Sequence, residues 1–186
     1  IFGDFIMISR FIALLLIVIL SPILLFTSFY IFFLDGLPVL FKQKRAGKGE
    51  TFFYIYKFRT MKKNTPDIPT DKLSSNPFYF GGNMLRKISI DEFPQLLNIL
   101  KGEMKFIGPR PALHNQFHLI QKRKELKISS LTPGITGWAQ INGRDKITEN
   151  EKIELDKYYL NNQSIILDLK ILLKTFIKVL SIKDIN

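Results

Sequence analysis

The chain has 186 residues, enough for one compact domain, and its 27 Lys and Arg against 16 Asp and Glu give a net charge of +11. A balance this basic favours anionic partners: nucleic acid, acidic lipid surfaces or phosphorylated small molecules. The sequence contains no cysteine, which excludes a disulfide, a thiol nucleophile and a cysteine-ligated metal. Because it begins at Ile1 rather than at a methionine, we expect further residues upstream.

The first predicted element is a membrane segment. Between Arg10 and Asp35 lie 24 residues without a charge, "FIALLLIVILSPILLFTSFYIFFL". As a helix they would measure about 36 Å, enough to cross a bilayer. The run is longer than the apolar region of a secretory signal, and no small-residue cleavage site follows it. Lysines and an arginine at 42–48 predict that the next residues are cytoplasmic.

Ser21 and Pro22 interrupt the middle of this apolar run. Pro22 has no N–H to donate to the carbonyl of Val18, and its ring crowds that carbonyl. We expect the Ser21 hydroxyl to bond back to a freed backbone oxygen such as that of Ile17. Two arrangements remain open from the sequence: a proline-kinked transmembrane helix, or a helix–break–helix that enters and leaves by one membrane face.

The next segments predict a hairpin, a loop and a helix. Residues 39–61 carry β-branched and aromatic residues on both sides of a Gly-Lys-Gly turn, which is typical of a β-hairpin, here near the membrane surface. Prolines and glycines among polar residues predict a loop over 62–83, which could close over a substrate. A helix is expected from about 90 to 101, with its end at Gly102.

Three further helices are predicted downstream, roughly over 112–127, 147–162 and 164–180. Rigid non-helical backbone, "IGPRP", precedes the first of them at 107–111. A structured loop with four turn formers and the only tryptophan separates the first from the second at 131–145.

The two last helices have recognisable features. Thr148 and Glu151 match a capping box at the start of the helix over 147–162. The helix over 164–180 is too charged to span a membrane, and its lysines recur every fourth residue along one stripe: Lys170, Lys174 and Lys178. Such a helix either lies in the membrane interface or packs on the domain core.

An acidic pair, Asp91 and Glu92, opens the helix over 90–101. Ser89 and Glu92 match a capping box, and Pro94 suits an early helical position. Capping therefore explains Glu92, but it leaves Asp91 without a role.

Phosphate chemistry is the alternative explanation of the acidic pair. Basic residues crowd it: Arg86 and Lys87 just before, and Arg110 between Pro109 and Pro111 just after. Helix N-termini and arginines hold phosphate oxygens. One carboxylate can hold Mg²⁺ against a pyrophosphate, and the other can attack phosphorus to form an acyl-phosphate.

Other readings are weaker. His114 and His118 lie four residues apart, but Asn115 stands where a zinc protease motif has glutamate, so we expect no metal there. The net charge alone would fit a membrane-tethered nucleic-acid-binding module. That module, or a non-catalytic membrane scaffold, would have no use for Asp91 beside Glu92, and we expect no nucleic-acid partner.

Several stretches together resemble the bacterial sugar transferase family, in its small monotopic phosphoglycosyl transferase form. They are "KFRTM" (57–61), "LRKISIDEFPQLLNILKGEMKFIGPRP" (85–111), "PGITGWAQINGR" (133–144) and "ELDKYYLNN" (154–162). The resemblance implies a mostly α fold with a small β-hairpin. It also implies a re-entrant helix–break–helix over 1–36, and a catalytic domain over 37–186 with interfacial amphipathic helices. The expected location is the cytoplasmic face of the bacterial inner membrane.

The reaction implied by the resemblance moves a phospho-sugar from a UDP-sugar to a polyprenyl phosphate, typically undecaprenyl phosphate, and releases UMP. Asp91 matches the nucleophile that attacks the β-phosphorus, and Glu92 matches a residue that helps to bind Mg²⁺. Pro109, Arg110 and Pro111 match an active-site segment in which we expect Arg110 to grip a phosphate. Further expected phosphate or uridine contacts are Lys57, Arg59, Arg86 and Arg144. Asp156 falls in a family motif, but no catalytic role is expected for it.

The identity of the donor sugar is a separate expectation from the reaction. The chain departs from the commoner family pattern at Lys105, where serine is usual, and at Leu131 and Thr132, where a basic residue often precedes Pro-Gly-Ile-Thr-Gly. Similarity to small members of glycoprotein pathways predicts an N-acetylated amino sugar, such as diacetylbacillosamine. A UDP-hexose donor for exopolysaccharide or capsule is the alternative. Downstream glycosyltransferases are expected partners.

Overall fold

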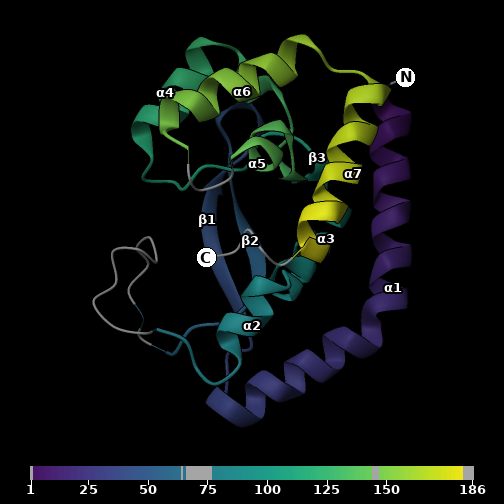
Figure 1. Cartoon of the computed structure of the whole chain (residues 1–186), viewed down its shortest axis with the longest axis vertical. Helices are drawn as coiled ribbons and strands as arrows, with labels where there is room; N and C mark the ends of the chain where they lie inside the picture. Colours follow the sequence, from purple (N-terminus) through teal and green to yellow (C-terminus); the bar gives the residue numbers. More distant parts are fainter. Residues whose placement is uncertain (1, 64, 66–76, 144–146, 182–186) are drawn as a thin grey trace.

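The computed structural model describes residues 2–63, 65, 77–143 and 147–181. Most of the loop expected over 62–83 and the expected site residue Arg144 therefore lie outside the described residues. Figure 1 shows a β-hairpin at the centre, with the long helix α1 along the right and lower edges and with α4 and α6 at the upper end. The predicted class, mostly α with a small hairpin, is confirmed.

Helix α1 runs over Phe2–Asp35 and continues through Pro22. Figure 1 shows that its axis changes direction between its two halves, so the feature is a bend within one helix rather than a break between two. The Ser21 hydroxyl donates to the carbonyl of Val18 at 2.8 Å. The expected acceptor, Ile17, was wrong, because the carbonyl in need of a donor is the one that proline leaves unpaired, four residues before it.

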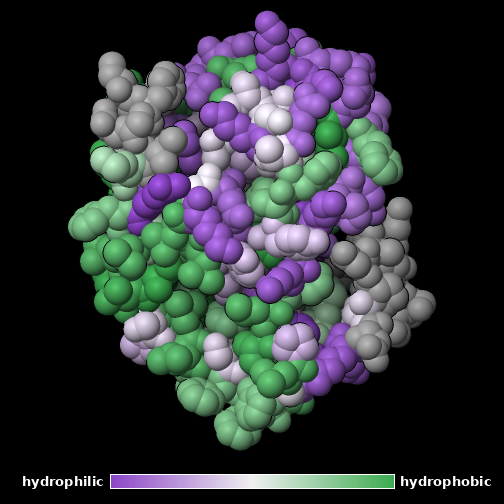
Figure 2. Space-filling view, turned by 180° about the vertical axis from the view of Figure 1, so that it is seen from behind, coloured by the Kyte–Doolittle hydropathy of each residue, from purple (hydrophilic) through white to green (hydrophobic). Residues whose placement is uncertain are grey.

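The surface of α1 is apolar and largely exposed. Its stretch Met7–Asp35 is the one helix among the described residues that is long and apolar enough to cross a membrane, on length and composition alone. Phe11, Phe26 and Phe33 are each more than two-thirds exposed, and the hydrophobic surface in Figure 2 gathers on the side where α1 lies. Whether α1 crosses the bilayer or returns to one face stays a prediction, as does the division into 1–36 and 37–186.

The hairpin consists of β1, Leu40–Ala46, and β2, Phe52–Phe58, joined by a short 3-10 turn, η1, at Lys48–Glu50. The strands are antiparallel, with Leu40 opposite Phe58 and Ala46 opposite Phe52, which confirms the prediction. Phe53 and Ile55 alternate inward along β2 and join a core with Ala13 of α1 and Leu96 and Ile99 of α3.

The segment with the acidic pair folds as three consecutive helical pieces: α2 at Gly82–Lys87, the 3-10 helix η3 at Ile90–Gln95, and α3 at Leu96–Lys101. Gly102 ends α3 in the left-handed conformation, φ +81°, as predicted. The capping box was wrong. Ser89 is itself left-handed, φ +59°, and its side chain caps nothing, whereas a capping residue is normally extended.

A second, parallel two-stranded sheet was not predicted. It pairs β3, Lys105–Ile107, with β4, Gly134–Thr136. Here the backbones come so close that a Cβ on Gly134 would lie 2.1 Å from the amide nitrogen of Gly108. The structured loop expected over 131–145 therefore contains β4 and the short helix α5, Trp138–Asn142.

The remaining elements are α4 at Phe117–Glu125, η4 at Ile128–Ser130, α6 at Glu149–Asn161 and α7 at Ile165–Ser181. The predicted capping box of α6 is confirmed, since Thr148 and Glu151 bond to each other's backbone N–H. Helix α4 starts later than the predicted residue 112. The reason is that the segment before it is extended beside β1, where Ala46 donates to the carbonyl of Ala112.

Helix α7 fits both of its predicted environments in part. Leu167 and Ile171 are buried against Ile141 and Tyr159, so one stripe packs on the core. The outward stripe exposes large apolar side chains, among them Ile166, Leu173 and Phe176. Placement of this face in the membrane interface stays a prediction.

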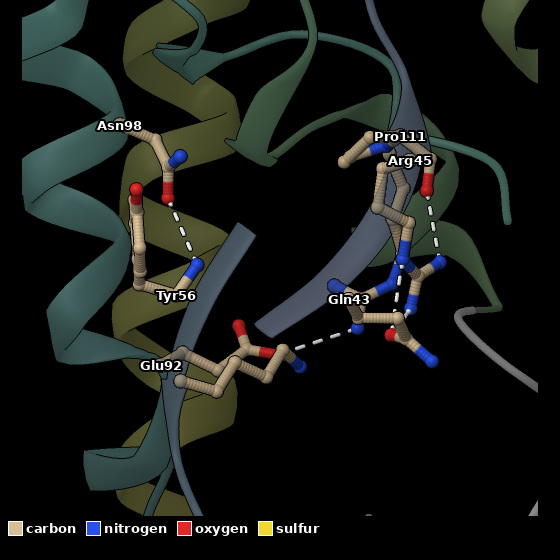
Figure 3. A network of polar contacts seen from close by, with 8 residues as sticks. Gln43, Arg45, Tyr56, Glu92, Asn98 and Pro111 are labelled. Carbon is tan, nitrogen blue, oxygen red and sulfur yellow. Dashed lines mark hydrogen bonds and ion pairs between the residues drawn. The ribbon is translucent and has the colours of Figure 1, made fainter. Parts of the chain in front are cut away.

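Asn98 joins α3 to the hairpin and is fully buried. Its Oδ1 accepts from the Tyr56 N–H at 3.1 Å (Figure 3), and its Nδ2 donates to the carbonyl of Tyr54 and to Glu103, each at 2.7 Å. We expect Asn98→Ala to lower the free energy of unfolding by about 2–4 kcal/mol, because it strands buried backbone groups. Thermal unfolding in detergent measures the loss. The exposed Asn161→Ala should change stability little, and equal effects of the two variants would contradict this role.

Candidate active site

Asp91 is a buried acid at the start of η3, with 6% of its surface exposed. Burial raises the pKa of its carboxyl from 3.8 to about 6, against the opposing pull of the Lys57 charge, while the neighbouring Glu92 adds to the rise. Arg86 and Arg110 also favour the ionised form. A raised pKa with specific charged neighbours is a feature of functional carboxylates.

Glu92 forms ion pairs with two basic side chains that come from different parts of the fold. Its Oε1 accepts from Lys57 Nζ at 2.7 Å and from Arg110 Nη2 at 3.3 Å. Lys57 is itself largely buried, so burial lowers its pKa while the charge of Glu92 opposes that fall. The acidic pair thus lies within a group of cations, as an anionic substrate would require.

The fold assembles this group from three segments. Strand β2 contributes Lys57, η3 contributes both acids, and the Pro-Arg-Pro segment at 109–111 contributes Arg110. The structure therefore brings together Lys57, Asp91, Glu92 and Arg110, as the resemblance implied. Arg86 of α2 is close enough for its charge to act on Asp91, and its guanidinium also lies 5.9 Å from the Phe78 ring.

The structure does not bring the Arg59 side chain into this group. Its guanidinium donates to the Asp35 carboxylate, to the carbonyl of Asp35 at 3.1 Å and to that of Gly36 at 2.6 Å. It therefore closes the C-terminal end of α1, where helix carbonyls lack partners. Nη1 and Nη2 of Arg59 thus face the end of α1, while its buried Nε has no hydrogen-bond partner among the described residues, and the expected phosphate contact from Arg59 stays a prediction.

A recess lies beside the Pro-Arg-Pro segment. It is small and open, with a volume of about 40 Å³, and its lining includes Pro109, Arg110 and Pro111, together with Gly47, Leu131 and Pro133.

Among the described residues, no group of three or more His, Cys, Asp or Glu side chains could hold a metal by itself. Mg²⁺ is usually bound through one or two carboxylates together with substrate phosphates, and Asp91 and Glu92 are donors of that kind. The acidic pair therefore fits a magnesium ion that arrives with a phosphorylated substrate. Of the two histidines at 114 and 118, for which no metal is expected, His118 has its Nδ1 3.2 Å from Glu149 Oε2.

A buried ion pair near the site was missed from the sequence. Arg123 of α4 and Asp156 of α6 contact each other, and Asp156 is 1% exposed. A signal was present: Asp156 stands three residues after Ile153 and three before Tyr159, both buried, and so lies on the buried face of its helix. A charge on such a face requires a partner.

Comparison with known proteins identifies similar chains. A family described as bacterial sugar transferase matches residues 6–182. An uncharacterized sugar transferase, EpsL of Bacillus subtilis (strain 168), is 45% identical over 163 residues, which cover 86% of this chain and 79% of that protein.

Two further relatives carry substrates in their names. A UDP-N-acetylgalactosamine-undecaprenyl-phosphate N-acetylgalactosaminephosphotransferase of Aeromonas hydrophila is 37% identical over 170 residues, 87% of this chain and 40% of that protein. A UDP-glucose:undecaprenyl-phosphate glucose-1-phosphate transferase of Escherichia coli (strain K12) is 35% identical over 175 residues, 89% of this chain and 38% of that protein.

We expect Asp91→Asn to stabilise the protein at neutral pH. Because the folded-state pKa is raised to about 6, the ionised carboxylate costs stability above that pH, on the order of 2–3 kcal/mol, and the cost fades as pH falls from 6 toward 4. The melting temperature of Asp91→Asn should therefore exceed that of the wild type at pH 7.5, and the difference should shrink near pH 4.5.

Glu151→Gln provides the matched control, since it makes the same acid-to-amide change at a true capping box. Glu151 is exposed, and its hydrogen bonds to Thr148 lower its pKa. This variant should therefore not raise the melting temperature. A lower melting temperature for Asp91→Asn would mean that Asp91 serves the helix start rather than a strained site.

Proposed function

The chain belongs to the bacterial sugar transferase family and is a phosphoglycosyl transferase; we propose that it transfers a phospho-sugar from a UDP-sugar to undecaprenyl phosphate and releases UMP. The family match over 6–182 supports the reaction class, and the relatives named for UDP-sugars and undecaprenyl phosphate support these substrates. The observation that carries the proposal is the buried Asp91 beside Glu92, surrounded by Lys57, Arg86 and Arg110.

Asp91 acts as the nucleophile in this proposal. Its carboxylate oxygen attacks the β-phosphorus of the UDP-sugar, and the bond from that phosphorus to the bridging oxygen breaks, so that the oxygen leaves with UMP. The phospho-sugar is then held on Asp91 as an acyl-phosphate. A phosphate oxygen of the polyprenyl phosphate attacks the same phosphorus, breaks the bond to Asp91 and regenerates the carboxylate.

The surroundings of Asp91 suit this role. With a pKa of about 6 the carboxylate is mostly ionised at neutral pH, yet burial leaves it poorly solvated and therefore reactive. Arg110 and Lys57 are placed to neutralise phosphate oxygens, since both already contact the carboxylate of Glu92.

Glu92 would hold Mg²⁺ in company with the pyrophosphate oxygens of the donor. When bound, the ion would neutralise charge on those phosphates.

The donor sugar is proposed as an N-acetylated amino sugar, and a UDP-hexose is the second candidate. The relative named for UDP-N-acetylgalactosamine supports the first, and the relative named for UDP-glucose supports the second, at nearly equal identity of 37% and 35%. Either product is a sugar linked through pyrophosphate to a lipid, and downstream glycosyltransferases would extend it in glycoconjugate assembly.

We place the protein at the cytoplasmic face of the bacterial inner membrane, with α1 entering and leaving by that face. The bend in α1 and its exposed apolar surface support this arrangement. A lipid phosphate stays at the level of the head groups, so a site that uses it must lie at the interface. A dipping helix and the apolar face of α7 would fix that depth.

The first test is incubation of purified protein with UDP-sugar and Mg²⁺ but without lipid acceptor. Intact mass should rise by one phospho-sugar, EDTA should prevent the rise, and undecaprenyl phosphate should remove the adduct. Asp91→Asn should acquire no adduct, whereas Asp168→Asn, an acid outside the site, should acquire it. An adduct on Asp91→Asn would refute the nucleophile. A panel of UDP-hexoses and UDP-N-acetylhexosamines identifies the donor by which one gives the adduct.

The second test concerns the membrane arrangement and benefits from the absence of native cysteines. Single cysteines at Asp4 and Lys48 lie before and after the apolar run. Both should react with an impermeant maleimide applied to inside-out vesicles, and neither should react when the reagent is applied from the periplasmic side. Labelling of the two positions from opposite sides would mean that α1 crosses the membrane.

A further inference from the structure

Every carbonyl of the Pro-Arg-Pro segment accepts a hydrogen bond from a different element. The Gly134 N–H of β4 donates to the carbonyl of Pro109 at 3.0 Å, and Arg123 of α4 donates to that of Arg110 at 2.8 Å. Arg45 of β1 donates to that of Pro111 at 3.0 Å (Figure 3). Because the two prolines have no N–H, this backbone is held mainly through its carbonyls.

Arg123 is itself held in place by Asp156. Its Nε and Nη2 donate to the same Asp156 oxygen at 3.1 and 2.6 Å, which leaves Nη1 for the carbonyl of Arg110. Both side chains are buried. A buried ion pair is often no more stabilising than apolar side chains of similar size, so stability alone explains this one poorly.

The carbonyl that Arg123 holds belongs to the residue whose side chain enters the site. The Arg110 guanidinium lies 3.3 Å from Glu92, beside the proposed nucleophile. A rotation of the Arg110 peptide would therefore move its guanidinium relative to both acids. Arg45 provides the second support, and its own Nε and Nη2 donate to Gln43 at 3.2 and 2.6 Å (Figure 3).

We propose that Arg123 and Asp156 are positioning residues, which fix the direction of the Arg110 guanidinium by holding the carbonyl of Arg110; this rests on the proposed function. Neither residue touches the substrate. Through this pair, helices α4 and α6 influence the site by way of a single backbone oxygen, the carbonyl of Arg110.

The test must separate positioning from folding. Replacing only one partner would leave a buried, unpaired charge, so both are replaced together as Arg123→Met with Asp156→Leu, which removes both charges and leaves two apolar side chains. We expect this double variant to melt as a folded protein while its rate of adduct formation from UDP-sugar falls on the order of ~10–100-fold. Lys124→Gln is the matched control, since Lys124 is the next residue of α4 and its pair with Glu50 at 2.8 Å is exposed. Its rate should equal that of the wild type.

A cycle with Arg110→Lys asks whether the pair acts through Arg110. Lysine keeps the charge but has no planar fork to be aimed. If positioning is the role, adding Arg123→Met with Asp156→Leu to Arg110→Lys should reduce the rate less than about threefold further, because the effects of coupled residues are not additive. A general loosening of the fold would instead multiply the two losses.

The outcomes distinguish the two proposals. No adduct on the wild type refutes the proposed function. An adduct on the wild type together with an undiminished rate in the pair variant, or with multiplied losses in the cycle, overturns the positioning role and leaves the proposed function standing.

Discussion

The burial of one carboxylate beside another is the constraint on which this structure depends. Asp91 and Glu92 are adjacent and mostly withdrawn from water, so each disfavours the charge of the other. The opposing charges come from a strand some 35 residues before the pair and from a proline-flanked segment 18 residues after it. Three parts of the fold each place charged side chains at this site: the hairpin, the helical segments from α2 to α3, and the Pro-Arg-Pro segment.

The same strand that serves the site also receives the apolar helix. Lys57 of β2 reaches Glu92, and Arg59, two residues further, holds the end of α1 through Asp35 and Gly36. Asn98 of α3 forms hydrogen bonds with the backbone of the same strand, at Tyr54 and Tyr56. The end of α1 and the position of the acids are therefore connected through a few residues within and just after β2.

What the sequence could predict was local. The hairpin, the end of α3 at Gly102 and the capping box of α6 follow from patterns within a few residues, and the structure confirms them. The sheet of β3 and β4 was missed because each strand has three residues, too few for a period, and because their pairing joins distant segments.

The residues of the candidate site show the same difference between local patterns and contacts of distant segments. The acids and Arg110 came from motifs, whereas the contacts of Arg123 with Asp156 and of Arg59 with Asp35 depend on packing between elements that are distant in the sequence. Ser89 shows the limit of a motif, because its backbone is left-handed and the spacing alone could not reveal it.

The hydrogen bond from the Ser21 hydroxyl to the carbonyl of Val18 bears on whether α1 needs a neighbouring helix at its bend. Within hydrocarbon a proline normally leaves a carbonyl that neighbouring helices or trapped water must satisfy. Here the preceding residue supplies the hydroxyl, so the bend carries its own donor. A helix bent in this way requires no neighbouring helix at that point, and a single apolar helix can lie in lipid with its backbone satisfied.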